Sequence, residues 1–188
     1  GIKVANDGNI GSVGDADSIA ISSAGRVSFS QVPITATKPA FRARLASDQT
    51  GVSDATYTKV TASTVDFDIG GYYDETTNYR YTPLVAGYYH FMAQVREVSG
   101  NDTQSLGPAI YKNGSLHQFT AVSPSSSNLD LQFSNIQTND IVFMNGSTDY
   151  VEFFGYANTE DGGNATFDAD GNTGTDATWW GGFLISGT

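Results

Sequence analysis

The sequence predicts an all-β protein, a two-sheet jelly-roll sandwich, from three observations. Apolar and polar residues alternate with the two-residue period of a strand in many short runs, whereas no stretch shows a convincing helical period. Only 15% of the 188 residues are charged, and Gly, Ser, Thr, Asn and Asp are abundant. The chain also carries 10 Tyr and 11 Phe. This mixture is typical of roughly eight to ten short strands joined by tight turns.

The charge of the chain restricts its partners. The formal net charge is −11 and the pI is near 4.2. Phosphate contacts need clustered Lys and Arg, so neither nucleic acid nor an anionic membrane surface is expected as a partner. No apolar run approaches the roughly 18 to 20 residues of a membrane span, so no membrane insertion is expected. The chain has no Cys and begins at Gly1 without a signal peptide, which indicates a disulfide-free piece of a longer protein.

Residues 1–37 are expected to form a short β-rich segment ahead of a head domain over residues 38–188. Alternating runs at Ser18–Ser22 and Arg26–Ser30 predict two strands. Two such strands cannot bury a core alone, so they need repetition or three chains wrapped together. Three glycines in this segment are interpreted as turn residues: Gly8, Gly11 and Gly14.

The head is expected to begin with a strand at Ala40–Leu45, followed by a polar loop at Ser47–Ala55. Residues Tyr57–Ile69 predict two strands around Ala62-Ser63. The Gly70–Glu75 loop follows, with two aromatic residues at its tip.

The stretch Tyr79–Phe91 organises the rest of the head. It contains a turn at Pro83–Gly87, after which a strand resumes. By the strand period, Tyr89 and Phe91 share one face, while Tyr88 and His90 share the other. Because both faces are aromatic, we expect a sandwich interior on one side and another subunit on the other.

The sequence of the second half of the head predicts further strands and turns. Asn113-Gly114 favours a two-residue hairpin, because both positions accept positive φ. Leu129, Leu131 and Phe133 alternate into a strand. The remaining expectations are a turn at Asn139-Asp140, a turn at Asn145-Gly146, a long acidic glycine-rich loop at Thr159–Thr178 and a closing strand at Trp179–Ser186.

Several motifs of the head resemble the globular C1q-like domain of the tumour necrosis factor superfamily. In chain order, they are Ala40-Phe41-Arg42-Ala43, Phe67-Asp68, Tyr73-Asp74, Asn78 with Tyr81 and Pro83, Gly87-x-Tyr89-x-Phe91, and Trp180-Gly181-Gly182-Phe183-Leu184. Their order and spacing agree over Lys38 to Thr188. The resemblance implies a homotrimer in which Tyr88 and His90 lie on the sheet that faces the three-fold axis. It also implies that Trp180 belongs to the core.

A second, shorter resemblance concerns the N-terminal segment. Residues Gly8–Ser22, followed by Val27–Gln31, resemble the connecting segments of bacteriophage tail-fibre proteins ahead of their terminal heads. This implies that the segment is the last piece of a trimeric shaft, on a virion surface or otherwise outside cells.

Aromatic residues near the predicted loops are candidates for glycan binding. Aromatic rings flanked by Asn and Asp can stack on sugar rings while the polar groups bind sugar hydroxyls. The candidates are Tyr72, Tyr73, Tyr150 and Trp179. Burial at strand ends is the alternative explanation for these residues.

The acidic loop offers oxygen ligands of the kind that calcium prefers, and Asp168-Ala-Asp170-Gly-Asn172 looks like the start of a calcium loop. However, the glycine comes too early for the helix-flanked motif, and no Glu follows at the required distance. The sequence therefore leaves two readings: a calcium site at Asp168, Asp170 and Asn172, or a solvated acidic loop.

We expect no enzymatic activity, because the chain has no Cys and both His90 and His117 lie in predicted strands without a nucleophile turn. The favoured hypothesis is a homotrimeric viral or phage fibre head that attaches to a host-cell surface glycan or protein. One alternative is a structural or capsid-decoration trimerisation module that binds no receptor. Another is a glycan-degrading enzyme, for which Asp66 and Asp68 on one strand face would supply the carboxylate pair.

Overall fold

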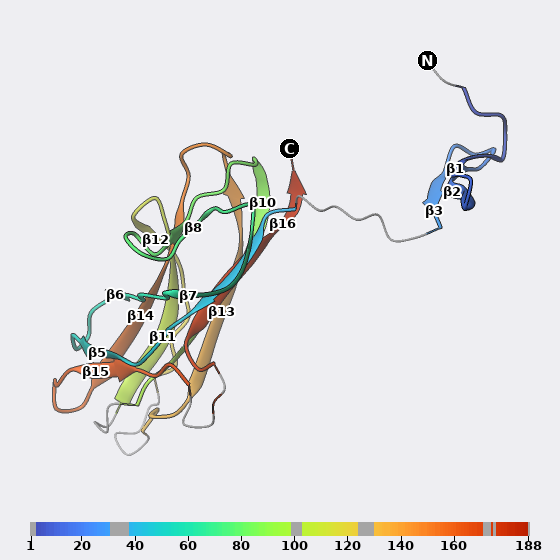
Figure 1. Cartoon of the computed structure of the whole chain (residues 1–188). Helices are drawn as coiled ribbons and strands as arrows, with labels where there is room; N and C mark the ends of the chain where they lie inside the picture. The colour runs from blue at the N-terminus through green and yellow to red at the C-terminus, as the bar shows by residue number, and fades with distance from the viewer. Residues whose placement is uncertain are drawn as a thin grey trace. The chain divides into compact units, whose positions relative to one another are not determined.

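The computed structural model describes residues 3–30, 38–98, 103–123, 130–170, 174 and 176–187. Over these residues the protein is built from antiparallel strands and contains no helix, which confirms the all-β prediction (Figure 1). The chain divides into two compact units, Gly1–Ala36 and Thr37–Thr188. We call them the N-terminal unit and the head.

The N-terminal unit is a three-stranded antiparallel sheet in the order β1 (Gly8–Ser12), β2 (Asp15–Ile21) and β3 (Val27–Phe29). The two predicted strands correspond to β2 and β3. The interpretation of Gly8 and Gly11 as turn residues was wrong, because both lie within β1. A Cβ on Gly11 would lie 2.2 Å from the carbonyl oxygen of Asp15, so the close approach of β2 requires glycine there. Of the three, only Gly14 lies between strands.

The head is a sandwich of two main sheets. One is five-stranded and has the order β13 (Asn135–Met144), β10 (Gly87–Arg96), β16 (Trp179–Gly187), β4 (Ala40–Arg44) and β7 (Thr64–Ile69). The other has the order β12 (Ser115–Phe119), β11 (Thr103–Lys112), β14 (Val151–Thr159), β9 (Arg80–Tyr81) and β8 (Tyr73–Asp74), and β6 (Thr58–Lys59) pairs with β14. We call it the six-stranded sheet.

A small ladder lies beside the two main sheets. It pairs β5 (Gln49–Val52) with β15 (Ala165–Phe167). The head thus has thirteen described strands, β4 to β16, more than the predicted eight to ten. The excess includes three short strands inside stretches that the sequence indicated to be loops: β5 in Ser47–Ala55, β8 in Gly70–Glu75 and β15 in Thr159–Thr178.

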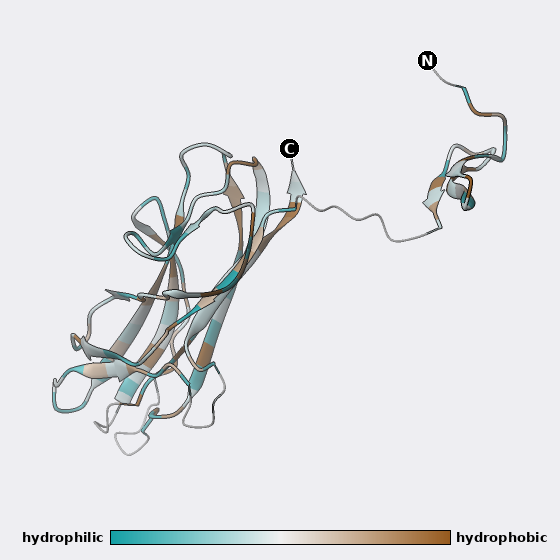
Figure 2. Ribbon diagram, viewed as in Figure 1, coloured by the Kyte–Doolittle hydropathy of each residue, from teal (hydrophilic) through white to brown (hydrophobic). Residues whose placement is uncertain are grey.

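The core lies between the two sheets and follows the predicted alternation. Tyr89 and Phe91 of β10 are fully buried, whereas Tyr88, which precedes them, is half exposed. Hydrophobic (brown) and more polar (white or teal) segments follow one another along the strands of the head (Figure 2). The ring of Phe41 stacks on Tyr81 at 4.2 Å and meets Trp180 edge-on at 4.7 Å between centroids. The predicted core position of Trp180 is therefore confirmed.

The hairpin at Asn113-Gly114 joins β11 to β12 with φ of 52° and 77°, which confirms the turn prediction. The predicted turn at Asn139-Asp140 was wrong. Residues 135–144 form one continuous strand, in which Asn139 pairs with Met92 and Asp140 with Phe91. Asn and Asp favour turns only where no long partner strand holds them, and β10 supplies that partner along its whole length.

The predicted strand through Leu131 and Phe133 is not formed. Leu131 is buried, but Phe133 has a positive φ of 65° and is about half exposed at 48%. The carboxylate of Asp130 accepts hydrogen bonds from the backbone N–H groups of Gln132 and Thr103, which holds the chain in a turn. Leu129 lies outside the described residues.

Candidate functional site

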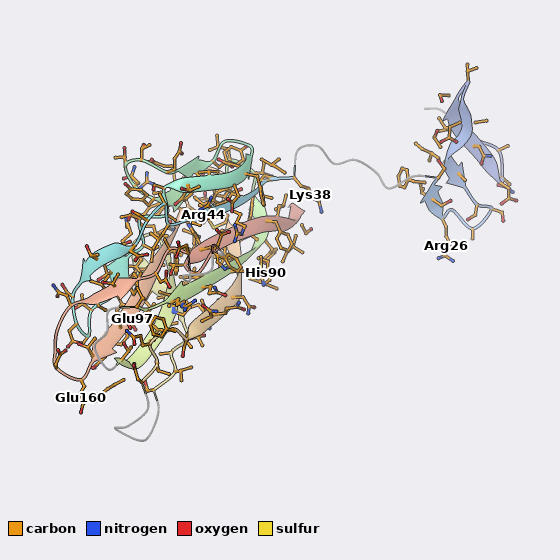
Figure 3. The ribbon with its side chains drawn as sticks, turned by 60° about the horizontal axis from the view of Figure 1, so that its bottom comes forward. Arg26, Lys38, Arg44, His90, Glu97 and Glu160 are labelled. Atoms are coloured by element: carbon orange, nitrogen blue, oxygen red, sulfur yellow. The ribbon has the colours of Figure 1, made fainter. Side chains whose placement is uncertain are left out.

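Exposed apolar side chains cover the outer face of the five-stranded sheet, the face turned away from the core. They are 41% to 57% exposed and come from three neighbouring strands: Tyr88 on β10, Ile141 and Phe143 on β13, and Phe183 and Ile185 on β16. We call this set the head apolar face. His90, labelled in Figure 3, lies among these residues.

Strand register makes this face continuous. Tyr88 pairs across the ladder with Phe143, and His90 pairs with Ile141 on one side and Phe183 on the other. The rings of Tyr88 and Phe143 are 5.5 Å apart, as are those of His90 and Phe183. A contiguous exposed apolar patch of this kind marks an interaction surface. Tyr88 and His90, predicted as interface residues, both lie on it.

Next to this face, the same sheet carries a charged network. The guanidinium groups of Arg42 and Arg44 each contact the carboxylates of both Asp66 and Asp176, three of the contacts at 2.8, 3.0 and 3.3 Å. Arg42 also lies over the ring of Trp179, 4.9 Å from its centroid. The ring of Trp179, a predicted glycan contact, is thus partly occupied by an intramolecular cation–π contact.

The arginine contacts bear on the possible carboxylate pair for glycoside cleavage. Asp66 contacts two arginines, while Asp68 accepts a hydrogen bond from the backbone N–H of Tyr73. A register irregularity in β7 at Asp66 separates the two residues in the ladder. Each carboxylate therefore has its own structural contacts.

A pocket of about 320 Å³ lies at the β8–β9 edge of the six-stranded sheet. Its lining is Gly71, Tyr72, Tyr73, Asp74, Arg80, Thr82 and Leu84. The guanidinium of Arg80 lies 4.5 Å from the ring centroid of Tyr150. The structure thus brings the predicted contacts Tyr72 and Tyr150 to the same edge, joined by an arginine that the sequence analysis did not single out.

For Tyr73, one of the predicted glycan contacts, the structure supports the alternative explanation, burial at a strand end. It is 6% exposed, its hydroxyl donates to the carbonyl of Ala62 at 2.7 Å, and its ring contacts Phe41 and Trp180. Burial raises the pKa of this hydroxyl far above its usual range. Tyr73 therefore belongs to the core, because β8 turns it inward.

The same edge is held by a well-ordered turn. The carboxylate of Asp74 accepts hydrogen bonds from the backbone N–H groups of Thr76, Thr77 and Asn78, and from the side-chain amide of Asn78. These bonds, led by the one from Thr77, hold the pKa of Asp74 well below its usual range. Asp74 is accordingly a charged cap that fixes the loop before Arg80.

The acidic loop is less solvated than the sequence indicated. Asp168 is 2% exposed, and its carboxylate lies 3.2 Å from the guanidinium Nε of Arg96. Asp170 lines a second pocket, of about 520 Å³, together with Arg44, Leu45, Ala46, Ser47, Asp48 and Ala169. Asn172 lies outside the described residues. Among the residues that the structure describes, no three His, Cys, Asp or Glu side chains form a metal-binding group.

An aromatic cluster on the outside of the six-stranded sheet escaped the sequence analysis. Its members are Tyr57, Tyr111, Phe119, Phe154 and Tyr156. The ring of Tyr57 lies 5.0 to 6.0 Å from three of the others, and its pKa is raised by burial. The alternation of Phe154 and Tyr156 was a signal for their shared face, but Tyr57 precedes its strand and only the fold brings it there.

The solved proteins that the head resembles in structure include the following three. The head resembles Eiger TNF from S. frugiperda with 9% identity, covering 80% of this chain and 93% of that chain at a TM-score of 0.56. It resembles murine APRIL with 11% identity, covering 79% of this chain and 99% of that chain at a TM-score of 0.54. It resembles the globular domain of zebrafish complement 1qA with 16% identity, covering 80% of this chain and 100% of that chain at a TM-score of 0.50. The head therefore has the jelly-roll fold of tumour necrosis factor and C1q domains, as predicted.

No family model and no curated protein matches the sequence. The N-terminal resemblance to tail-fibre connectors thus remains a prediction. Among the described residues, no helix has the length and apolar character needed to cross a membrane.

Proposed function

We propose that this protein is a non-enzymatic, homotrimeric head of a viral or phage fibre, which attaches to a glycan or protein on a host-cell surface. It would act on the virion surface or elsewhere outside cells. The observation that carries the proposal is the head apolar face. The resemblance to C1q-like domains, which implies a trimer, supports the same conclusion.

The composition of the head apolar face supports association with further copies of the chain. Its five apolar side chains lie on adjacent strands of a rigid sheet. Fully burying such a side chain is worth roughly 1.5–3 kcal/mol, and these are already about half buried, so burying the rest is worth about 1 kcal/mol for each and favours association. We propose Tyr88 and His90 as members of that interface.

The solution mass tests the trimer. The mass of one chain is 19.9 kDa, and we expect light scattering after size exclusion to give three times this mass. Ile141→Asp should give a monomer, because it places a charge in the buried interface. Asn135→Asp is the matched control, since it adds the same charge at an exposed position of the same strand. A monomeric wild-type protein would remove the basis of the proposal.

The pocket at the β8–β9 edge supports the attachment function. It combines the ring of Tyr72 with the charged groups of Asp74 and Arg80, and Tyr150 extends the same edge. An aromatic surface with nearby hydrogen-bonding groups suits a sugar ring. Three such sites on one trimer would act together, so each need bind only weakly.

A glycan array tests attachment, followed by binding to intact host cells. Tyr150→Ala should abolish binding while the trimer mass is retained. Leu116→Ala is the control, because Leu116 is also an exposed side chain but lies on β12. A stable trimer that binds neither glycans nor cells would favour the alternative, a structural or decoration module. Release of reducing sugar from a bound glycan would instead favour an enzyme.

A further inference from the structure

The N-terminal unit is an amphipathic sheet. Across its three strands, Ile10 pairs with Ile19 and Ile19 with Phe29, so these side chains form one row. Two residues along, Ile21 pairs with Gly8 and Val27. Because residues two apart in a strand share a face, both rows lie on the same side of the sheet.

Val4 completes this side. A Cβ on Gly8 would lie 2.4 Å from Cγ1 of Val4, so the side chain of Val4 fills the place that a side chain at Gly8 would take. The six apolar residues are Val4, Ile10, Ile19, Ile21, Val27 and Phe29. We call them the N-terminal apolar face.

The opposite side of the sheet is small and polar. The row between the two apolar rows consists of Asn9, Ala20 and Ser28. Ser30 continues this side, and its hydroxyl donates to the carboxylate of Asp15 at 2.8 Å. The sheet therefore has one side suited to water and one that is not.

Nothing within the described part of this unit covers the apolar side. No side chain described in residues 3–30 is buried, and Ile10, Val27 and Phe29 are about half exposed, at 46%, 55% and 51%. Three strands of seven residues or fewer do not hold together in water unless one face is buried. The unit therefore needs a partner for this face.

We propose that the N-terminal apolar face packs against the same face of other copies of this chain, as a second self-association surface separate from the head. The face carries no charge, so only an apolar surface complements it. Every other copy of this chain carries such an apolar surface, because each has its own N-terminal apolar face. The inference rests on the proposed function, because a trimeric head would hold three N-terminal units at high effective concentration.

Single cysteines test the proposal, because the chain has none of its own. Phe29→Cys places a thiol on the apolar side and Ser28→Cys places one on the polar side of the same strand. Each full-length variant is oxidised with diamide and resolved by non-reducing electrophoresis. We expect Phe29→Cys to form disulfide-linked dimers roughly tenfold faster than Ser28→Cys, since packed faces hold their thiols close together.

The result separates the two ideas when the mass of each variant is measured in parallel. A trimeric mass with equal crosslinking of Phe29→Cys and Ser28→Cys, or with none, overturns the inference and leaves the trimeric head intact. Selective crosslinking of Phe29→Cys in a protein whose mass does not change with Ile141→Asp supports the inference and counts against the head interface. Monomers without selective crosslinking overturn both.

Discussion

The ion pair between Arg96 and Asp168 shows how one residue's environment decides its role. The Asp168 side chain is 2% exposed and that of Arg96 is 16% exposed. Removing one partner of a buried pair leaves the other charge in a medium that solvates it poorly. The acidic sequence around Asp168 left a calcium ligand or a solvated loop as the two readings, whereas the fold gives this carboxylate a structural contact.

We expect Asp168→Asn to lower the free energy of unfolding by about 3–5 kcal/mol, the usual cost of breaking a buried pair. Urea unfolding at pH 7 and fixed protein concentration measures the change. Asp140→Asn is the control, because Asp140 and its partner His117 are each 37% exposed. That variant should lose at most about 1 kcal/mol. If both variants lose the same free energy of unfolding, burial of the ion pair between Arg96 and Asp168 adds nothing to stability.

The buried phenols predict how stability depends on alkaline pH. Burial raises the pKa of Tyr89 to about 12 and raises that of Tyr73 and Tyr81 still further, above their ordinary 10.0. Each neutral phenol therefore contributes stability that is complete below pH 10.0 and decreases as pH rises toward 12. We expect the midpoint of urea unfolding to decrease over this range. A midpoint constant to pH 12 would contradict the buried positions of these hydroxyls.

At the scale of the element, alternation within strands was readable from the sequence because it depends only on local spacing. The faces of β10 and the hairpin at Asn113-Gly114 were predicted correctly for this reason. The continuous strand through Asn139-Asp140 was not predicted, and the sequence did not decide between exposure and burial of Tyr73. Both depend on partners distant in the chain. The contact between Arg80 and Tyr150 beside the pocket shares this limit, since β9 and the start of β14 meet only in the folded sheet.

The turn at Asn145-Gly146 offers a test of close packing between elements. Gly146 has φ of 70°, and a Cβ there would lie 2.3 Å from the backbone nitrogen of Ala86. Gly162 has φ of 69°, yet its Cβ would meet nothing within 4 Å. Both positions carry the same backbone strain, so a comparison of their alanine variants isolates the clash.

We expect Gly162→Ala to cost about 1 kcal/mol from the left-handed backbone, and Gly146→Ala to cost about 1–3 kcal/mol more. Thermal melts of both variants at equal concentration measure the difference. If the two melting temperatures coincide, the loop at Ala86 moves aside and does not fix the turn.

At the scale of the whole molecule, each of the two units has an apolar surface that the described residues of that same unit leave uncovered. The net charge of −11 opposes association of identical chains. The apolar surfaces therefore have to supply the attraction, and added salt should help them by screening that repulsion.

Association coupled to stability predicts a melting temperature that depends on concentration, because partners that bind the folded state stabilise it by mass action. We expect the melting temperature of the wild-type chain to increase by a few degrees for each tenfold increase in protein concentration, and to increase further in moderate salt. Ile141→Asp should remove most of the concentration dependence, and Asn135→Asp should retain it. A wild-type melting temperature independent of concentration would mean that the subunits do not dissociate when they unfold. Light scattering in urea would then show whether the unfolded chains are still trimers or were monomers from the start.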